Sequence, residues 1–286
     1  MANLKEIRAR ITSISSTMQI TSAMKMVSAA KLKKAQDAIV MVRPYSEKLQ
    51  ELIENVNSNP DPDNISPYAK QRSVKKVLYI AVTSNRGLAG AFNSSVIKEL
   101  NTRISTENCE VEILTVGKKV HDAVHKTRKV FDNQSSVFDA LTFDVVGKFT
   151  KKVMNEFTLG TFDKVYIVYN KFINAATQEV ITEQVLPIAM PEISASTIKT
   201  DYVFEPNAKE ILDVLIPKSI KTQVYKAILD SVASEHGARM TAMHKATDNA
   251  EALRNELKIF YNKARQAAIT NEILEIVSGA EALKAS

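Results

Sequence analysis

The last stretch of the chain, residues 218–286, restricts the possible fold more than any other part of the sequence. It contains no proline and only two glycines, Gly237 and Gly279. At a rise of about 1.5 Å per residue, one helix over this stretch is on the order of 100 Å long. A compact domain does not need such a helix, which is typical of coiled coils, repeats and shafts.

The apolar residues of this stretch follow the spacing of a coiled coil. Alternating steps of four and three residues predict a seam that comprises Tyr225, Leu229, Val232, His236, Arg239, Met243, Ala246, Ala250, Leu253, Leu257, Phe260, Ala264, Ala267, Asn271 and Leu274. The seam is polar at His236 and Arg239 and continues beyond them in the same frame. Gly237 lies between them and costs up to about 1 kcal/mol of helix propensity, which predicts local flexibility.

A second long amphipathic segment opens the chain. One frame of the same spacing comprises Leu4, Ile7, Ile11, Ile14, Met18, Thr21, Lys25, Ser28, Leu32, Ala35, Ile39, Val42, Ser46, Leu49, Ile53 and Val56. Around its polar centre the apolar residues shift to Ile20, Met24 and Val27, which predicts an apolar side that faces another direction. Pro44 lies inside the pattern and predicts a kink near Val42.

Between these segments the periodicity changes to that of an α/β domain. Proline-rich sequence indicates a linker, and apolar runs at 77–82, 111–116, 165–169, 179–186 and 202–204 predict strands that alternate with helical stretches. Five of the seven glycines fall between Gly87 and Gly160, as expected for the loops of such a domain. The predicted organisation is an N-terminal helix (1–57), a linker (58–72), a Rossmann-like domain with a mainly parallel sheet (73–206), and a C-terminal helix (207–286).

The two helices are predicted to pair antiparallel, with their polar interruptions facing one another. This register places Lys25 near Arg239, Met18 near Ala246, Ile7 near Leu257, and Leu4 near Phe260. Residues beyond about Tyr261 then have no partner within the chain. That end carries Ile269, Ile273, Leu274, Ile276 and Val277, and exposure of these side chains costs about 25 cal/mol per Å². Another protein is therefore expected to surround it.

The charge and the single cysteine narrow the functional class. The formal charge is +6, and all of the excess lies in residues 1–50, which fits a solvated basic helix or a segment that docks on acidic or anionic surfaces. The lone Cys109 excludes an internal disulfide and fits a reducing compartment. The chain opens without a leader sequence and has no apolar run of membrane-spanning length, so a soluble or peripheral protein is expected.

Three short motifs favour structural roles. The loop SNRGLAGAFN follows a predicted strand and precedes a helix, but it matches neither of the common phosphate-binding patterns and lacks their lysine and hydroxyl. The pair His121 and His125 in HDAVH resembles a zinc motif only weakly, because Asp122 replaces glutamate and no third ligand is evident. Cys109 has no neighbouring base to activate it.

Several long motifs carry a family resemblance. The opening LKEIRARITSISSTMQITSAMKMVSAAKLKKAQ, the phrases VRPYSEKL, SNRGLAGAFN and YIVYNKFIN, and the closing SEHGARMTAMHKATDNA and YNKARQAAITNEILEIVSGAEAL closely resemble the γ subunit family of bacterial F-type ATP synthases. The match covers nearly the whole chain. It implies a long antiparallel two-helix coiled coil with an inserted α/β domain.

The resemblance also implies a function without chemistry in this chain. A γ subunit is the central rotor shaft, which couples proton-driven rotation of the c-ring to conformational cycling of the β catalytic sites and regulates ATPase activity and proton flow. The implied partners are three α and three β subunits, the ε subunit and the membrane c-ring, with one γ per complex. No catalytic residue, metal or cofactor is implied. The implied location is peripheral, at the cytoplasmic face of the bacterial inner membrane.

Family motifs assign partner contacts to particular residues. Contacts with β are implied for Met24, Lys25, Arg239, Arg265, Gln266, Thr270 and Glu272. An apolar bearing is implied for Ile273, Leu274, Ile276 and Val277. Proximity to the c-ring or ε is implied for Lys31, Lys33, Lys34, Tyr202 and Glu205.

Two other functional classes stay open from sequence. A basic coiled coil could bind nucleic acid through residues 1–50, although Tyr45 is the only aromatic residue there. A nucleotide-dependent α/β enzyme is disfavoured by the incomplete phosphate-binding loop.

Overall fold

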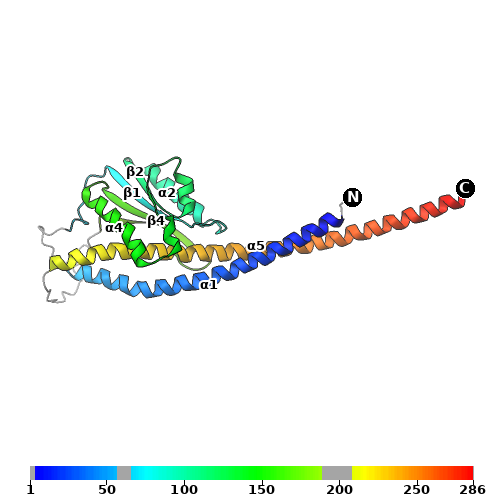
Figure 1. The fold of residues 1–286 in the computed structure, drawn as a ribbon, viewed down its shortest axis with the longest axis horizontal. Helices are drawn as coiled ribbons and strands as arrows, with labels where there is room; N and C mark the ends of the chain where they lie inside the picture. The colour runs from blue at the N-terminus through cyan, green and yellow to red at the C-terminus, as the bar shows by residue number, and fades with distance from the viewer. Residues whose placement is uncertain (1–3, 57–65, 189–207, 286) are drawn as a thin grey trace. The chain divides into compact units, whose positions relative to one another are not determined.

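A computed structural model describes residues 4–56, 66–188 and 208–285. In chain order the elements are α1 (Leu4–Val56), β1 (Lys76–Val82), α2 (Phe92–Thr106), β2 (Glu110–Val116), α3 (Lys118–Val124), β3 (Val130–Asn133), a 3-10 helix (Ser135–Asp139), α4 (Phe143–Leu159), β4 (Lys164–Phe172), β5 (Gln178–Leu186) and α5 (Ala208–Ala285). Two long helices flank an α/β domain in the sequence, which confirms the predicted fold class (Figure 1).

The sheet has five strands in the order β3-β2-β1-β4-β5. β3, β2, β1 and β4 are parallel, and β5 pairs antiparallel with β4 at one edge. The predicted edge strand at 179–186 is therefore confirmed. β3 and α4 were not predicted, because β3 has only four residues and the α4 sequence lies in a stretch to which no periodicity was assigned. The predicted strand at 202–204 lies outside the described residues.

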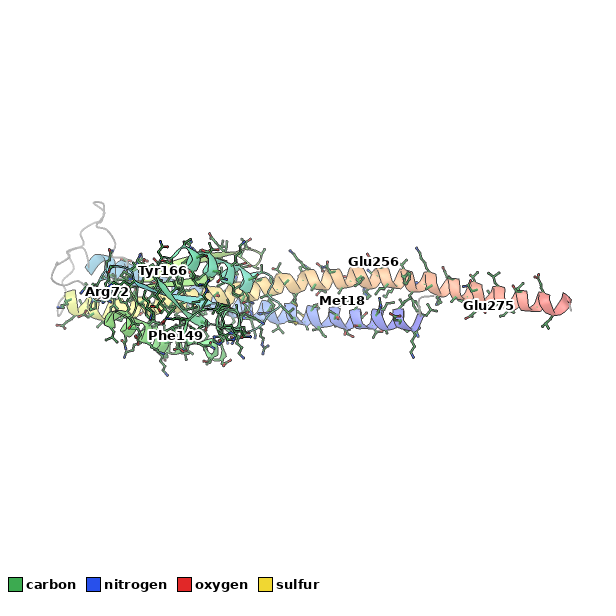
Figure 2. The ribbon with its side chains drawn as sticks, turned by 90° about the horizontal axis from the view of Figure 1, so that it is seen from above. Met18, Arg72, Phe149, Tyr166, Glu256 and Glu275 are labelled. Atoms are coloured by element: carbon green, nitrogen blue, oxygen red, sulfur yellow. The ribbon has the colours of Figure 1, made fainter. Side chains whose placement is uncertain are left out.

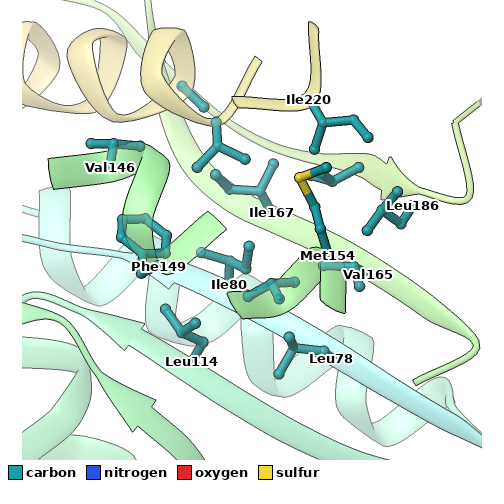
Figure 3. Close-up of a cluster of buried hydrophobic side chains, with 14 of the residues drawn as sticks. Leu78, Ile80, Leu114, Val146, Phe149, Met154, Val165, Ile167, Leu186 and Ile220 are labelled. Atoms are coloured by element: carbon teal, nitrogen blue, oxygen red, sulfur yellow. The ribbon is translucent and has the colours of Figure 1, made fainter. Parts of the chain in front are cut away.

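Alternate residues of the strands bury opposite faces of the sheet. Val77, Tyr79 and Ala81 point toward α2 and α3, whereas Leu78 and Ile80 point toward α4 and α5. Figure 3 shows this second cluster, in which side chains from the sheet, α4 and α5 interdigitate. Such two-sided burial explains why the strands read as continuous apolar runs.

The first part of α5 belongs to the core of this domain. Ile216, Ile220, Val224 and Ile228 recur every four residues and are completely buried in the cluster with α4 and the sheet. α5 begins at Ala208 and passes through Pro217, although a helix-internal proline loses a backbone hydrogen bond. Burial of the flanking isoleucines offsets that loss. α1 likewise continues through Pro44.

The chain divides into two compact units, and the boundaries between them fall within α1 and α5. One unit comprises residues 28–239 and contains the α/β domain, and the other comprises residues 1–27 and 240–286. In α1, all predicted seam positions from Leu4 to Ile53 are buried or half-buried. Of the shifted apolar residues, Ile20 and Val27 are exposed and Met24 is half-buried. The α1 pattern is thus confirmed through Ile53.

In the smaller unit, five predicted seam positions of α5 are exposed instead of buried, namely Leu253, Phe260, Ala267, Asn271 and Leu274. Leu253 and Phe260 are 46% and 50% exposed, whereas Arg254 and Tyr261 are half-buried in their place. The hydroxyls of Thr21 and Thr247 lie 2.8 Å apart, whereas the predicted register pairs Thr21 with Met243. The real register is offset by about one helical turn. Heptad spacing fixes the period of a seam, but cross-helix contacts such as this one fix its rotation and offset.

Burial of α5 against the sheet predicts a large effect of truncation at Ile220. We expect Ile220→Ala to lower the free energy of unfolding of the α/β domain by about 2–5 kcal/mol, because it leaves a cavity under the sheet. Ile276→Ala removes the same atoms from the same helix where the side chain is 71% exposed, and should change stability by less than about 0.5 kcal/mol. Chemical denaturation of both variants, followed by circular dichroism, measures the difference. Equal losses would contradict this account of the core.

Candidate functional site

The end of α5 presents exposed polar and apolar residues together. Arg265, Gln266, Thr270 and Glu272 are all exposed, and the Thr270 hydroxyl donates only back to the Gln266 carbonyl within the helix, at 3.0 Å. The structure therefore brings these four predicted contact residues onto one accessible stretch of helix.

The predicted bearing residues are equally accessible. Ile273, Leu274, Ile276 and Val277 are 55%, 57%, 71% and 49% exposed. We call these four residues, with the exposed Ile269, the apolar tip. Within the smaller unit, the last turns of α5 run past the N-terminal end of α1 (Figures 1 and 2).

Further apolar residues face solvent in the same unit. On α5, Leu253, Ile259 and Phe260 are exposed, and they extend the apolar surface toward the middle of the helix. Sequence analysis assigned Leu253 and Phe260 to the seam and so missed them as surface residues. On α1, Met24 and Lys25 are half-buried.

Within the larger unit, α5 makes directional contacts with the carboxyl ends of β1 and β4. The buried Ser234 hydroxyl donates to the Asn170 carbonyl at 3.0 Å, and the Asn170 side chain donates to the Phe92 carbonyl at 3.1 Å. A Cβ atom on Gly237 would lie 3.2 Å from the carbonyl oxygen of Ala175, in the turn after β4. Gly237 therefore permits close packing, which corrects the expectation that it adds flexibility.

Arg239 points into the protein and is 8% exposed. Its Nη2 donates to the carbonyls of Arg86 and Gly87, both at 3.2 Å, and its Nη1 lies 2.6 Å from a carboxylate oxygen of Glu235. These carbonyls belong to the SNRGLAGAFN loop, which is thereby fixed to α5. The structure thus gives the Arg239 guanidinium partners within its own chain.

Burial controls the ionisation of the groups beside Arg239. Burial raises the pKa of Glu235, although the adjacent Arg239 favours its charged form. Burial, together with the nearby cations Arg239 and Lys31, lowers the pKa of His236 to about 4. His236 is therefore neutral at neutral pH, and the Glu235 carboxyl group lies against the Arg239 guanidinium.

One further carboxyl group is buried on α5. Burial raises the pKa of Asp230 to about 6, which Lys226, Arg43 and Lys171 partly oppose and Glu183 reinforces. Asp230 is 6% exposed. Its charged form therefore carries a desolvation cost that these cations do not remove.

The predicted basic residues near the c-ring or ε lie on the outside of α1. Lys31, Lys33 and Lys34 are exposed, and Lys33 pairs with Asp37 at 2.9 Å. Tyr202 and Glu205 lie outside the described residues.

The other motifs have local structural explanations. In the SNRGLAGAFN loop, the Asn85 side chain donates to the Ser135 carbonyl and accepts from the Lys118 amide. The rings of His121 and His125 stack with centroids 5.2 Å apart, and His121 lies 3.3 Å from the Thr115 hydroxyl. Burial and the neighbouring Glu107 raise the pKa of Cys109, which disfavours a reactive thiolate.

The described residues lack two features, namely a metal-holding cluster and a membrane-spanning helix. Among them, no group of three or more His, Cys, Asp or Glu side chains is arranged to hold a metal ion. None of the helices in the described part of the chain is both long and apolar enough to cross a membrane.

Chains in solved structures of mitochondrial ATP synthases share this fold. The mitochondrial ATP synthase of Euglena gracilis contains a chain that aligns over 99% of this chain and 95% of its own length, with a TM-score of 0.68 and 21% identity, in a structure of its OSCP, F1 and c-ring in rotational state 3. A second structure, of the Euglena rotor in rotational state 1, gives a TM-score of 0.64 over 93% of this chain and 98% of the other, at 22% identity. The chain therefore shares the fold of these ATP synthase chains.

Sequence comparisons identify the family. The ATP synthase family profile matches residues 3–283. The ATP synthase gamma chains of Flavobacterium psychrophilum and Flavobacterium johnsoniae are 62% and 60% identical, over 99% of this chain and 100% and 99% of theirs. This chain belongs to the ATP synthase gamma chain family, the central stalk subunits of rotary ATP synthases. The comparisons give no support to nucleic-acid binding.

The buried Asp230 predicts a pH-dependent stability difference. Its folded-state pKa, about 6, lies above the usual 3.8, so its contribution to stability is present below about pH 4 and is lost as pH rises through about 6. We expect Asp230→Asn to gain stability relative to wild type with rising pH, by up to about 3 kcal/mol above pH 7. Denaturation midpoints between pH 4 and 8 measure this. The exposed Asp122→Asn should show no such trend, and a pH-independent difference for Asp230→Asn would refute the assignment.

Proposed function

We propose that this chain is the non-catalytic rotor shaft of its ATP synthase. It transmits c-ring rotation to the β catalytic sites in turn during ATP synthesis, and transmits rotation in reverse during hydrolysis-driven proton pumping. The observation that carries the proposal is the exposure of the apolar tip to solvent in the described fold. Exposed apolar surface of this kind marks a protein interface.

The surface near the tip is proposed to contact β. Arg265, Gln266, Thr270 and Glu272 supply polar contacts to a β loop, and the apolar tip turns within a largely apolar sleeve formed by α and β. Met24 and Lys25 face the acidic lever segment of β. The guanidinium of Arg239 is bonded to Arg86, Gly87 and Glu235. We therefore propose that Arg239 contributes to the same surface indirectly, through the loop that it holds.

The other end of the shaft is proposed to meet ε and the c-ring. Lys31, Lys33, Lys34, Tyr202 and Glu205 are the residues assigned to that end. One copy of the chain then sits within three α and three β subunits, peripheral to the cytoplasmic face of a bacterial cell membrane. Exposure of the three lysines supports their share of this assignment.

Assembly and nucleotide binding together test the proposal. Co-expression with the α and β subunits should give a complex with ATPase activity, and calorimetry with ATP should show no tight binding by the isolated chain. Tight nucleotide binding by the chain alone, without assembly, would exclude the shaft function and favour a nucleotide-dependent enzyme.

A substitution at Met24 tests the β-facing surface. We expect Met24→Lys to reduce the number of protons pumped per ATP hydrolysed while the complex still assembles. The added ammonium, next to Lys25, gains a charge-assisted hydrogen bond to acidic β groups in only some rotary positions, so it biases the cycle. Met24→Leu keeps the volume and adds no charge. Equal coupling ratios for Met24→Lys and wild type in membrane vesicles would count against this contact.

Removal of the end of α5 tests the bearing. We expect deletion of residues 275–286 to weaken torque transmission and to change the free energy of unfolding by less than about 0.5 kcal/mol, because residues 275–281 and Leu283 are exposed. Torque from single-molecule rotation and stability from denaturation are compared on the same variant. Global unfolding of the truncated chain would show that the tip supports the fold and would contradict its assignment as a bearing.

A further inference from the structure

We propose that Ser234, Gly237 and Arg239 form a torsional clamp, which fixes the angle of α5 about its own axis against the α/β domain. The inference rests on the proposed rotor function, because the angle of α5 matters only if the chain carries torque. It assigns to Arg239 a positioning role within the chain.

The clamp differs in kind from the other contacts of α5 with the domain. Ile216, Ile220, Val224 and Ile228 are held by apolar burial, which is not directional and tolerates a small rotation or slide of the helix. Hydrogen bonds lose strength steeply when their angle or distance changes. Polar contacts at the end of this buried stretch therefore resist twist more sharply than the apolar stretch does.

The three clamp residues reach three separate parts of the domain. Ser234 bonds to Asn170 at the end of β4, and Asn170 in turn bonds to the first residue of α2. Gly237 packs against the turn after β4. Arg239 bonds to two successive carbonyls of the loop after β1. Because these contacts lie at different places around the helix, rotation of α5 in either direction strains at least one of them.

The environment of Arg239 strengthens its two carbonyl contacts. The guanidinium is almost completely buried, and Glu235 neutralises it at 2.6 Å from the preceding turn of the same helix. Hydrogen bonds from a charged donor are stronger than neutral ones, and low exposure to water increases the difference. The loop that accepts them also holds Leu88, which has a positive φ of 61° and is 66% exposed. A loop with such a backbone needs external support.

The position of the clamp along α5 fits a torsional role. Arg239 is the last residue of the unit that contains the α/β domain, and the residues after it belong to the second compact unit. Twist that travels along α5 from its free end therefore reaches the α/β domain first at this level. Loss of the clamp leaves the fold of the domain in place but moves the point of firm attachment toward Ile228.

Angular fluctuations of a stalled rotor test the clamp. The α, β and γ subunits are assembled with Cys109→Ser and Lys126→Cys in γ, and a bead on the introduced cysteine reports the angle of the α/β domain without nucleotide. The variant Glu235→Gln/Arg239→Met removes the carbonyl contacts and leaves no buried unpaired charge. We expect the variance of its bead angle to rise roughly twofold, because the segment opens locally more often.

A matched control uses the same change of residue types at the same spacing. Glu99 and Arg103 form an exposed pair on α2 at 2.7 Å, and Glu99→Gln/Arg103→Met should leave the variance unchanged. Equal variance of the bead angle for the two double variants would overturn the clamp. In that case, rotation of the wild-type complex with ATP would still support the proposed shaft function. Absence of wild-type rotation would instead overturn the proposed function. If the Arg239 variant fails to assemble, Ser234→Ala, which removes one hydrogen bond, decides: unchanged variance overturns the clamp, and increased variance supports it.

Discussion

Burial of one face of α5 against the sheet is the constraint on which the rest of the structure depends. Without that helix, the face of the sheet formed by Leu78, Ile80 and Ile167 loses the cover that Ile216, Ile220, Val224 and Ile228 provide beside α4. The segment that completes this core follows β5 in the sequence by way of residues 189–207, so the domain closes only when the C-terminal helix returns to it. A central stalk subunit thus has no α/β domain separable from its shaft.

The same helix changes its physical environment along its length. Near Ile220 it is a core element, near Arg239 it is held by directional polar contacts, and near Ile276 it is surrounded by solvent in the described fold. Each section accordingly responds to a different kind of substitution: loss of volume in the first, loss of hydrogen bonds in the second, and loss of a partner surface in the third. Function and stability are therefore separable along α5 although its backbone is continuous.

Sequence periodicity predicted α1 more accurately than α5, for a physical reason. The predicted seam positions of α1 coincide with its contact face from Ile7 to Ile53, although other apolar residues of this helix, such as Ile20 and Met41, are exposed. α5 carries apolar residues on several sides, because part of it enters the α/β core and part presents apolar surface to solvent. A single seam drawn through such a helix mixes these surfaces, which is how Leu253 and Phe260 came to be assigned to the interior. β3 was not predicted because a strand of four residues depends on tertiary contacts more than on local pattern. α4 is different, because its 17 residues bury Val146, Phe149, Val153 and Phe157 at helical spacing, and this pattern was overlooked.

The candidate site was predictable where it consists of side chains that do not pack against other parts of the chain. The apolar tip follows from counting residues beyond the N-terminal end of α1, and this count survives an offset of one helical turn. The role of Arg239 was not predictable, because its partners are the backbone carbonyls of Arg86 and Gly87. Every residue has a backbone carbonyl, so the sequence does not show which of them accepts a hydrogen bond. Gly237 shows the same limit: helix propensity suggests a weak point, whereas the approach of Ala175 shows a tight contact.

The composition of the apolar tip supports a role outside the folding of this chain. Ile269, Ile273, Ile276 and Val277 are β-branched, and such residues lose side-chain freedom in a helix. A solvent-exposed helix is better served by Ala, Glu, Lys or Arg, which have higher helix propensity and lower cost in water. These residues are therefore unfavourable both for helix formation and for solubility in the isolated chain. Both costs fall when a surrounding protein surface covers the tip, because it buries the apolar side chains and holds the helix in place.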